Sequence, residues 1–329
     1  MKTLALSNQD AGRLFLHRHW LSDAPQGDAK GDALLQVIQG LGFVQLDSIN
    51  TVGRAHDLIL FSRKPRYRPS GLKRLYENDN ALFEHWTHDA AVIPMAYYPY
   101  WEMRRQRDAE TLRKRYRNWH KHDFESQFDK LLDQIRDQGP VCSADVGKDE
   151  KRSNSGWWDW HPSKTALEYL WRTGALHVIG RDGFQKRYDL TERVLEAHLC
   201  DATAAPDDTA TIDWCCNGAL ERLGFATHTE LAAFWDHISP AEAKDWVARE
   251  LADGRLQPIM VTCASGETRG AFARPDIAND PALQIGPTQR LRVLSPFDPA
   301  LRDRKRAERL FGFNYRVEMF VPEAKRTYG

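Results

Sequence analysis

Hydrophobic residues recur with helical spacing in some stretches of the chain and alternate or cluster in others, which predicts helices interspersed with short hairpins. A helical apolar stripe is formed by Leu34, Leu35, Val37, Ile38 and Leu41. Gly42 can end this helix in a left-handed conformation. An earlier helix is predicted to begin at Ser7 or Asn8. The runs 82–86 and 91–94 then predict two strands of a hairpin. Helices followed by a hairpin are typical of a winged-helix domain.

The same succession recurs twice along the chain. Residues 175–179 and 184–188 are predicted strands around an Asp-Gly turn, which strongly favours a hairpin. Residues 259–261 and 270–272 predict a third hairpin. The helices that precede these hairpins are predicted to begin at Pro162, Thr229 or Glu230, and Pro240. The three units are similar in layout and not in sequence, and no short-period repeat of the solenoid kind is present.

The stretch after Gly42 is short, apolar and partly alternating, which predicts a strand over 43–49. On a strand, Gln45 and Asp47 face the same side, about 7 Å apart along the backbone. Val44 and Leu46 face the other side and can be buried. A carboxylate and an amide that project together can hold a water molecule and stabilise a developing positive charge. For the tripeptide alone, a solvated strand face is the more common explanation.

Composition restricts the class of protein further. The chain has 329 residues, 42% of them apolar and 28% charged, which fits a globular protein with two or three small domains. The formal net charge is zero, so only local charge can mark a nucleic-acid partner. The five cysteines show no metal-binding spacing, and an odd number without a disulfide framework is typical of a reducing cytoplasm. Neither a signal-peptide pattern nor an apolar run of membrane-spanning length is evident.

Several longer motifs occur in a fixed order. They are Val44-Gln45-Leu46-Asp47-Ser48-Ile49-Asn50 with Val52, Arg54, His56 and Leu60-Phe61-Ser62-Arg63, then Trp86-Thr87-His88-Asp89-Ala90, Gly139-Pro140-Val141-Cys142-Ser143-Ala144-Asp145, Ser155-Gly156-Trp157-Trp158-Asp159-Trp160, Phe184-Gln185-Lys186-Arg187-Tyr188-Asp189-Leu190, Leu294-Ser295-Pro296-Phe297-Asp298-Pro299 with Asp303-Arg304-Lys305-Arg306-Ala307-Glu308, and Lys325-Arg326-Thr327-Tyr328-Gly329. These motifs span nearly the whole chain and closely resemble the YcaQ/AlkZ family of DNA glycosylases. The Gln-x-Asp motif matches the YcaQ-like branch, whereas the other branch has Gln-x-Gln.

The resemblance implies an α+β fold of three tandem winged-helix units braced by a C-terminal β-barrel. We therefore expect a first unit with the Gln-x-Asp strand, a second with charged helices, a third winged helix and the start of the barrel, at residues 1–100, 101–200, 201–285 and 286–329. Members of the family continue beyond the position of Gly329, so the barrel is expected to be incomplete relative to the family.

The activity that the resemblance implies is hydrolysis of the N-glycosidic bond of N7-alkylguanine in double-stranded DNA, including the unhooking of interstrand crosslinks. Alkylation at N7 makes guanine cationic, so the base can leave without a general acid, and one carboxylate can suffice where ordinary glycosidases use two. We assign Asp47 to water activation and to electrostatic stabilisation of the oxocarbenium-like sugar. Gln45 would hold the water or the lesion. Arg54, His56 and His88 are expected to support the site.

Histidines and tryptophans near these motifs have alternative roles. The pair His85-x-x-His88 lacks the Glu and the helical spacing of a zinc protease motif, and residues three apart on a strand face opposite sides. A hydrogen-bonded core histidine is the more common role, and we expect neither metal nor cofactor. Trp157, Trp158 and Trp160 either stack on bases or fill a core, and we favour the core for at least one of them.

Basic side chains after the first site motif and on the second hairpin are predicted to contact DNA. They are Arg63, Lys64, Arg66, Arg68, Lys73, Arg181, Lys186 and Arg187. Arginines also crowd the predicted helices within 97–138, where a solvated face is the usual explanation and a phosphate-tracking face the less common one.

A non-catalytic winged-helix DNA-binding protein, such as a regulator, is the main alternative function, because fold alone does not decide function. An inactive homologue that keeps a binding surface is a third interpretation. No Gly-rich phosphate loop and no lysine placed for Schiff-base chemistry stand out, so a monofunctional glycosylase is expected. We expect a monomer in the cytoplasm that associates with the nucleoid when it binds DNA.

Overall fold

The computed structural model describes residues 3–22, 27–120, 123–148, 150, 160–286, 288, 290–318 and 321–327. The chain forms two compact units, and we describe each by itself. Unit 1 consists of Met1–Arg68 and Ile212–Gly329, and unit 2 of Pro69–Thr211. Unit 2 is therefore inserted in the sequence of unit 1. This division cuts across the predicted boundaries at residues 100, 200 and 285, because distant parts of the chain pair within unit 1.

A four-stranded sheet in unit 1 joins the beginning of the chain to a distant hairpin. Its strands lie in the order β1 (Leu4–Leu6), β9 (Gln257–Thr262), β10 (Thr268–Ala273) and β8 (Phe225–Ala226). The antiparallel pair β9–β10 is the third predicted hairpin, which is confirmed. Strand β1 pairs in parallel with β9, and no local pattern predicted this contact. The long-range pair therefore makes unit 1 discontinuous in sequence.

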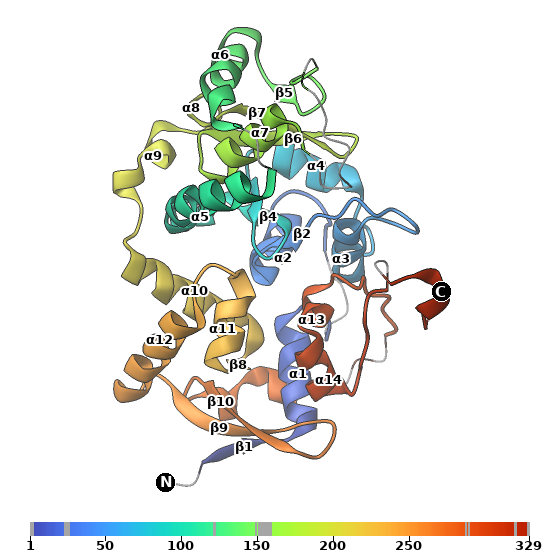
Figure 1. Cartoon of the computed structure of the whole chain (residues 1–329). Helices are drawn as coiled ribbons and strands as arrows, with labels where there is room; N and C mark the ends of the chain where they lie inside the picture. Colours follow the sequence, from blue (N-terminus) through green and yellow to red (C-terminus); the bar gives the residue numbers. More distant parts are fainter. Residues whose placement is uncertain are drawn as a thin grey trace. The chain divides into compact units, whose positions relative to one another are not determined.

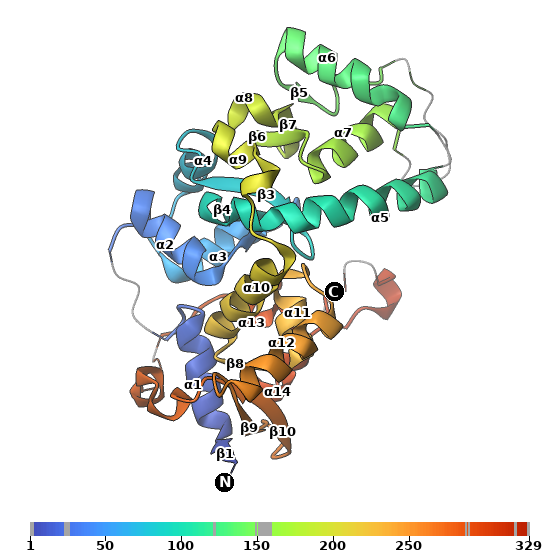
Figure 2. The same cartoon turned by 90° about the vertical axis from the view of Figure 1, so that its left-hand side faces the viewer.

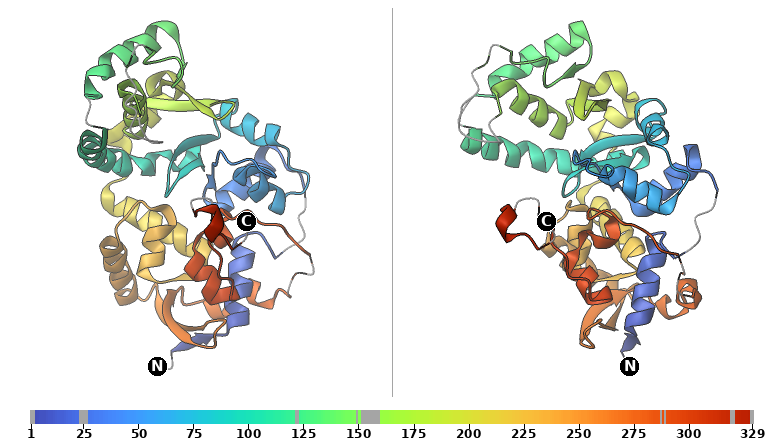
Figure 3. Two further views of the ribbon diagram at one scale, coloured as in Figure 1. Left: turned by 45° about the vertical axis from the view of Figure 1, so that its right-hand side comes forward. Right: turned by 90° about the vertical axis from the view of Figure 1, so that its right-hand side faces the viewer.

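The helices of unit 1 begin and end largely where the sequence predicts. They are α1 (Asn8–Arg18), α2 (Gly31–Leu41), α3 (Ala55–Arg63), the connecting α10 (Asp208–Leu223), α11 (His228–Trp235), α12 (Pro240–Ala252), α13 (Pro299–Arg302) and α14 (Arg304–Phe311). Ser7 caps α1, and Gly42 ends α2 with φ 91°, as predicted. Helix α11 begins slightly before the predicted start, because Thr227 and Glu230 form a capping box. Helix α1 lies beside α14 (Figures 1 and 3).

Unit 2 contains the first two predicted hairpins, which are both confirmed. Strands β3 (Leu82–Trp86) and β4 (Ala90–Pro94) pair in antiparallel fashion. A second sheet has the order β5 (Val141–Cys142), β7 (Gln185–Leu190) and β6 (Leu176–Asp182). The helices are α4 (Pro69–Glu77), α5 (Glu102–His120), α6 (Phe128–Gln138), α7 (Pro162–Arg172), α8 (Thr191–Val194) and α9 (Ala197–Cys200). The long helix α5 packs against α7 (Figure 2).

The β-barrel predicted for residues 286–329 is not found. From residue 290 onward, the described residues form α13, α14 and a 3₁₀ helix, Glu323–Lys325, but no strand. Apolar side chains of this segment are not covered by a sheet, since Leu291 is 92% and Val293 77% exposed. Within the predicted barrel segment, residues 312–318 have no regular structure, and Met319 and Phe320 lie outside the described residues. Among the helices that the structure describes, none has the length and apolar character needed to cross a bilayer.

Candidate functional site

The strand that carries Gln45 is shorter than predicted. Strand β2 comprises Val44–Gln45 alone, and the chain from Leu46 to Asn50 has no regular structure. Val44, Gln45 and Leu46 are all buried, with 0%, 4% and 6% of their surfaces exposed. The predicted alternation over 43–49 is therefore wrong, because three successive residues are buried and the strand ends before Asp47. Asp47 projects from the segment that follows the strand and not from the strand itself.

The carboxylate of Asp47 is held by a hydrogen bond from the nearby backbone. Its Oδ1 accepts a hydrogen bond of 2.7 Å from the backbone N–H of Ile49, which is an Asx-type turn. Its other carboxylate oxygen makes no hydrogen bond to any residue in the described part of the chain, and the residue is half-buried. One oxygen therefore fixes the orientation of the carboxylate, and the second can accept a hydrogen bond from water or face a positive charge.

Arg54 and His56 are positioned by α3, which packs against β2. Arg54 is the N-cap residue of this helix, and His56 lies in its first turn. His56 is 9% exposed, and its Nε2 lies 3.9 Å from Oδ2 of Asp57. Unit 1 thus places both predicted supporting residues on the helix that supports the Gln45 strand. His88 belongs to unit 2, where it follows β3 and is exposed.

Arg63 does not have the exposed position that a DNA contact requires. It is 2% exposed and forms a buried two-pronged ion pair with Asp298, in which Nη2 donates to Oδ1 at 2.8 Å and Nη1 contacts Oδ2. Its Nε donates to the backbone carbonyl of His19 at 3.1 Å. The direct DNA contact predicted for Arg63 is wrong, because its guanidinium ties α3 to the segment before α13. The sequence offers no local signal for this pair.

The remaining predicted contacts of the connecting segment are accessible. Arg66 and Arg68 are exposed, and Lys64 is half-buried. In unit 2, the side chain of Lys73 is 66% exposed and lies 3.7 Å from Glu77. Of these cations, Arg66, Arg68 and Lys73 are exposed enough to reach a phosphate.

The predicted DNA contacts on the second hairpin also differ: two cations are paired with acids and one is exposed. Arg181 pairs with Glu84 at 2.6 Å, and Lys186 pairs with Glu168 at 2.9 Å. Burial lowers the pKa of Lys186, and the neighbouring Glu168 opposes that shift. Both cations pair with acids inside unit 2, and their direct DNA contacts stay predictions. Arg187 is exposed and remains available to DNA.

The acidic partners of Arg181 and Lys186 were not predicted from the sequence. Glu84 lies in β3 and is 1% exposed, and Glu168 on α7 is 6% exposed. An acidic residue in a short, mostly apolar strand was the one available signal, because buried carboxylates need a partner. Tyr76 donates a hydrogen bond of 3.1 Å to Glu84, and the indole of Trp86 donates one of 3.1 Å to Glu168. Each acid therefore binds its cation and one further donor inside unit 2.

A metal role for the histidines receives no support from the described residues. His85 is buried, its Nε2 lies 3.2 Å from the carbonyl of Arg172, and burial holds its pKa well below the usual value. No group of three or more potential ligands occurs within the described ranges. Trp157 and Trp158 lie outside the described residues, and Trp160 is half-buried with the Lys164 ammonium 4.7 Å from its ring.

Comparison with known proteins adds information that the geometry does not contain. Residues 38–329 match the family model described as DNA glycosylase AlkZ-like. The fold is similar to that of the DNA glycosylase AlkZ of Streptomyces sahachiroi, with a TM-score of 0.57 and 16% sequence identity. That similarity covers 91% of this chain and 77% of the other chain. The family match includes the Gln45–Asp47 segment, α3 and the C-terminal segment that holds Asp298.

Proposed function

Because the chain belongs to the family of AlkZ-like DNA glycosylases, we propose that it hydrolyses the N-glycosidic bond of N7-alkylguanine in double-stranded DNA, interstrand crosslinks included. The observation that carries the proposal is the Asp47 carboxylate, which one hydrogen bond orients and which keeps an oxygen for the reaction. Gln45, Arg54 and His56 support it from β2 and α3. His88 is proposed as a further supporting residue of unit 2.

The proposed reaction follows from the charge of the substrate. The bond between N9 of the base and C1′ of the sugar breaks, and its electron pair neutralises the cationic base. The oxygen of a water molecule bonds to C1′, while Asp47 accepts or directs the proton of that water. The negative charge of Asp47 also stabilises the oxocarbenium-like sugar as it forms. No general acid is needed, because the alkylated base leaves as a neutral molecule.

We propose that the enzyme is monofunctional. Lys186 is the described lysine whose pKa is lowered by burial, and lysines of this kind can form Schiff bases. Its Nζ is instead held by Glu168 at 2.9 Å and lies 3.4 Å from the centre of the Trp171 ring. We expect abasic DNA as the product, without a backbone nick. Borohydride added during turnover should trap no covalent protein–DNA adduct, and a trapped adduct would contradict this assignment.

We expect DNA binding to be sequence-tolerant and sensitive to salt through the exposed cations. Arg187→Gln and Lys73→Gln should each reduce the slope of log K against log salt by about 0.9 on duplex DNA. Lys130→Gln on α6 is a control that alters another exposed lysine of unit 2. Fluorescence anisotropy at several salt concentrations measures the slope. Slopes unchanged in both variants would remove these residues from the interface.

The preferred lesion can be tested directly. A duplex with a defined N7-guanine interstrand crosslink should be unhooked by the purified full chain, as scored on a denaturing gel. A duplex with N7-methylguanine should lose the base at the same Asp47-dependent site. Tight DNA binding without release of either base would favour the alternative, a non-catalytic DNA-binding protein.

A further inference from the structure

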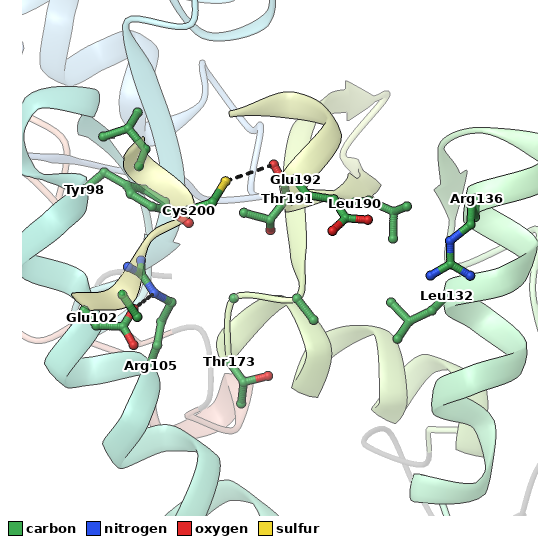
Figure 4. A pocket seen from close by; sticks show the side chains of 14 residues that line it. Tyr98, Glu102, Arg105, Leu132, Arg136, Thr173, Leu190, Thr191, Glu192 and Cys200 are labelled. Carbon is green, nitrogen blue, oxygen red and sulfur yellow. Dashed lines mark hydrogen bonds and ion pairs between the residues drawn. The ribbon is translucent and has the colours of Figure 1, made fainter. Parts of the chain in front are cut away.

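Unit 2 contains a cavity of about 410 Å³ that is separate from the residues assigned to catalysis. Its walls are formed by α5, α6, the turn after α7 and the segment from Leu190 to Ala202. Figure 4 shows Tyr98 and Arg105 on one side and Leu132 and Arg136 on the other, with Thr191 between them. A half-open cavity with a few convergent polar groups is the usual form of a small-molecule site.

The first polar group is the Arg105 guanidinium, which is only partly satisfied. Arg105 is 7% exposed, and its Nε donates to Glu102 Oε2 at 2.9 Å. Its guanidinium carbon lies 4.3 Å from the centre of the Tyr98 ring. Its Nη1 is buried and has no hydrogen-bond partner among the residues that the structure describes. Buried donors are nearly always satisfied in proteins, so this N–H marks a position for an acceptor.

A glycine makes room for this arginine. Gly174 has φ 92°, and a Cβ added to it would lie 2.6 Å from Cδ of Arg105. Gly174 also lines the cavity. The backbone at this point therefore both requires a glycine and lets the arginine side chain pass to the cavity wall.

The second polar group is the hydroxyl of Thr191. This residue is 7% exposed, and its Oγ1 is buried without a hydrogen-bond partner in the described part of the chain. Thr173 lines the same cavity but differs in one respect, since its hydroxyl donates to the carbonyl of Tyr169 at 2.9 Å. The hydroxyl of Thr191 therefore lacks a partner among the described residues, whereas that of Thr173 is already used.

The charged groups and the thiol around the cavity are consistent with a ligand that accepts hydrogen bonds. Glu102 is occupied by Arg105 and by a 3.1 Å hydrogen bond from Gln106. Glu192 opposes an anion but is exposed to solvent, which weakens its effect. Arg136, which forms an ion pair with Asp133, is a second, 54% exposed cation on the opposite wall. Burial raises the pKa of the Cys200 thiol, so it is neutral near pH 7. Leu132 and Leu190 supply apolar surface.

We propose that this cavity binds a small molecule whose carboxylate or phosphate oxyanion accepts hydrogen bonds from Arg105 Nη1 and Thr191 Oγ1. A charged donor such as Arg105 Nη1 makes a stronger hydrogen bond to either oxyanion than a neutral donor, and the buried position strengthens the contact. The apolar body of the ligand packs against Leu132 and Leu190. This site does not take part in the glycosylase reaction, so its occupancy is independent of Asp47.

Isothermal titration calorimetry on the full chain, at constant ionic strength, tests the site with three probes: inorganic phosphate, succinate and deoxyguanosine monophosphate. We expect at least one probe to bind with a Kd of about 1 mM or tighter. Thr191→Val preserves the shape and removes the hydroxyl, and it should weaken that Kd by about tenfold or more. Thr173→Val is the matched control and should leave the Kd unchanged, as should Asp47→Asn.

The calorimetry distinguishes a phosphate ligand from a carboxylate ligand, and it can also refute the proposed site. Binding of phosphate and the nucleotide without succinate assigns a phosphate ligand, and the reverse pattern assigns a carboxylate ligand. Failure of all three probes at concentrations of about 10 mM overturns the proposal. Equal affinity of Thr191→Val and unaltered protein overturns it as well, because a ligand held elsewhere does not depend on this hydroxyl.

Discussion

Replacement of Asp47 by Asn should lower the excision of N7-alkylguanine by about 10²–10⁴-fold, as for the loss of a general base. Asparagine keeps an oxygen that can accept the hydrogen bond from the Ile49 N–H, so the turn is preserved. What is lost is the negative charge that activates water and stabilises the sugar cation. Single-turnover rates on a defined lesion measure the effect, and DNA affinity should hold or rise slightly because a negative charge near phosphate is removed.

Two further variants make this result specific. Asp32→Asn removes an exposed carboxylate from α2 of the same unit and should leave the rate unchanged. Gln45→Ala should cost less than Asp47→Asn, because an amide positions the reactants without carrying charge. Since Gln45 is 4% exposed, the stability of that variant must be measured beside its rate. Full activity in Asp47→Asn would overturn the assignment of this site.

Replacement of Asp298 by Asn should destabilise unit 1 by about 3–5 kcal/mol, because it leaves the Arg63 charge buried without its counter-charge. Both side chains of the pair are fully buried. Asparagine can still accept from the Ala300 N–H at the start of α13, which the native carboxylate does at 3.0 Å. The cap of α13 is kept in this variant, so the destabilisation comes from the loss of the negative charge. Hydrogen exchange of amides in α3 and α13 reports the free energy of opening.

The control for this experiment is a surface pair in the same unit. Asp213 and Arg249 are each 44% exposed, and Asp213→Asn should change the same free energy by no more than about 1 kcal/mol. Replacing the buried pair together, as Arg63→Met with Asp298→Leu, should recover much of the loss, because no unpaired charge remains. If the double variant is as unstable as Asp298→Asn, the pair stabilises unit 1 mainly through its hydrogen bonds to the backbone, such as those to His19 and Ala300.

Structural features that depend on residues adjacent in the sequence were predicted from local patterns. The three hairpins, the Ser7 cap and the left-handed Gly42 are each specified by adjacent residues, and all are present. The Gln45 strand was predicted too long, because apolar Leu46 and Ile49 fit a strand equally well while the Asp47 side chain bonds its own backbone.

Tertiary contacts decided the features that the sequence could not predict. Arg63, Arg181 and Lys186 have the side chains of phosphate contacts, yet each is neutralised by an acid between 18 and 235 positions away in the chain. Whether a basic residue is exposed or buried depends on that partner, which no spacing rule identifies. The same reason explains the missed parallel pairing of β1 with β9. The family resemblance identified the Gln-x-Asp motif but implied a barrel that the described residues do not form.

The interrupted sequence of unit 1 has a consequence during protein synthesis. Residues up to Arg68 emerge from the ribosome before any of Pro69–Thr211, and β9 emerges later still. Leu14 lies close to Gly224 and Phe15 packs against Phe311 in the finished protein, so both lack these contacts while all of unit 2 is made. Chains at this stage expose apolar surface and an unpaired β1 strand, which are the features that chaperones bind and that promote aggregation. Slower translation between residues 69 and 261 would lengthen this exposed interval and lower the yield of folded protein.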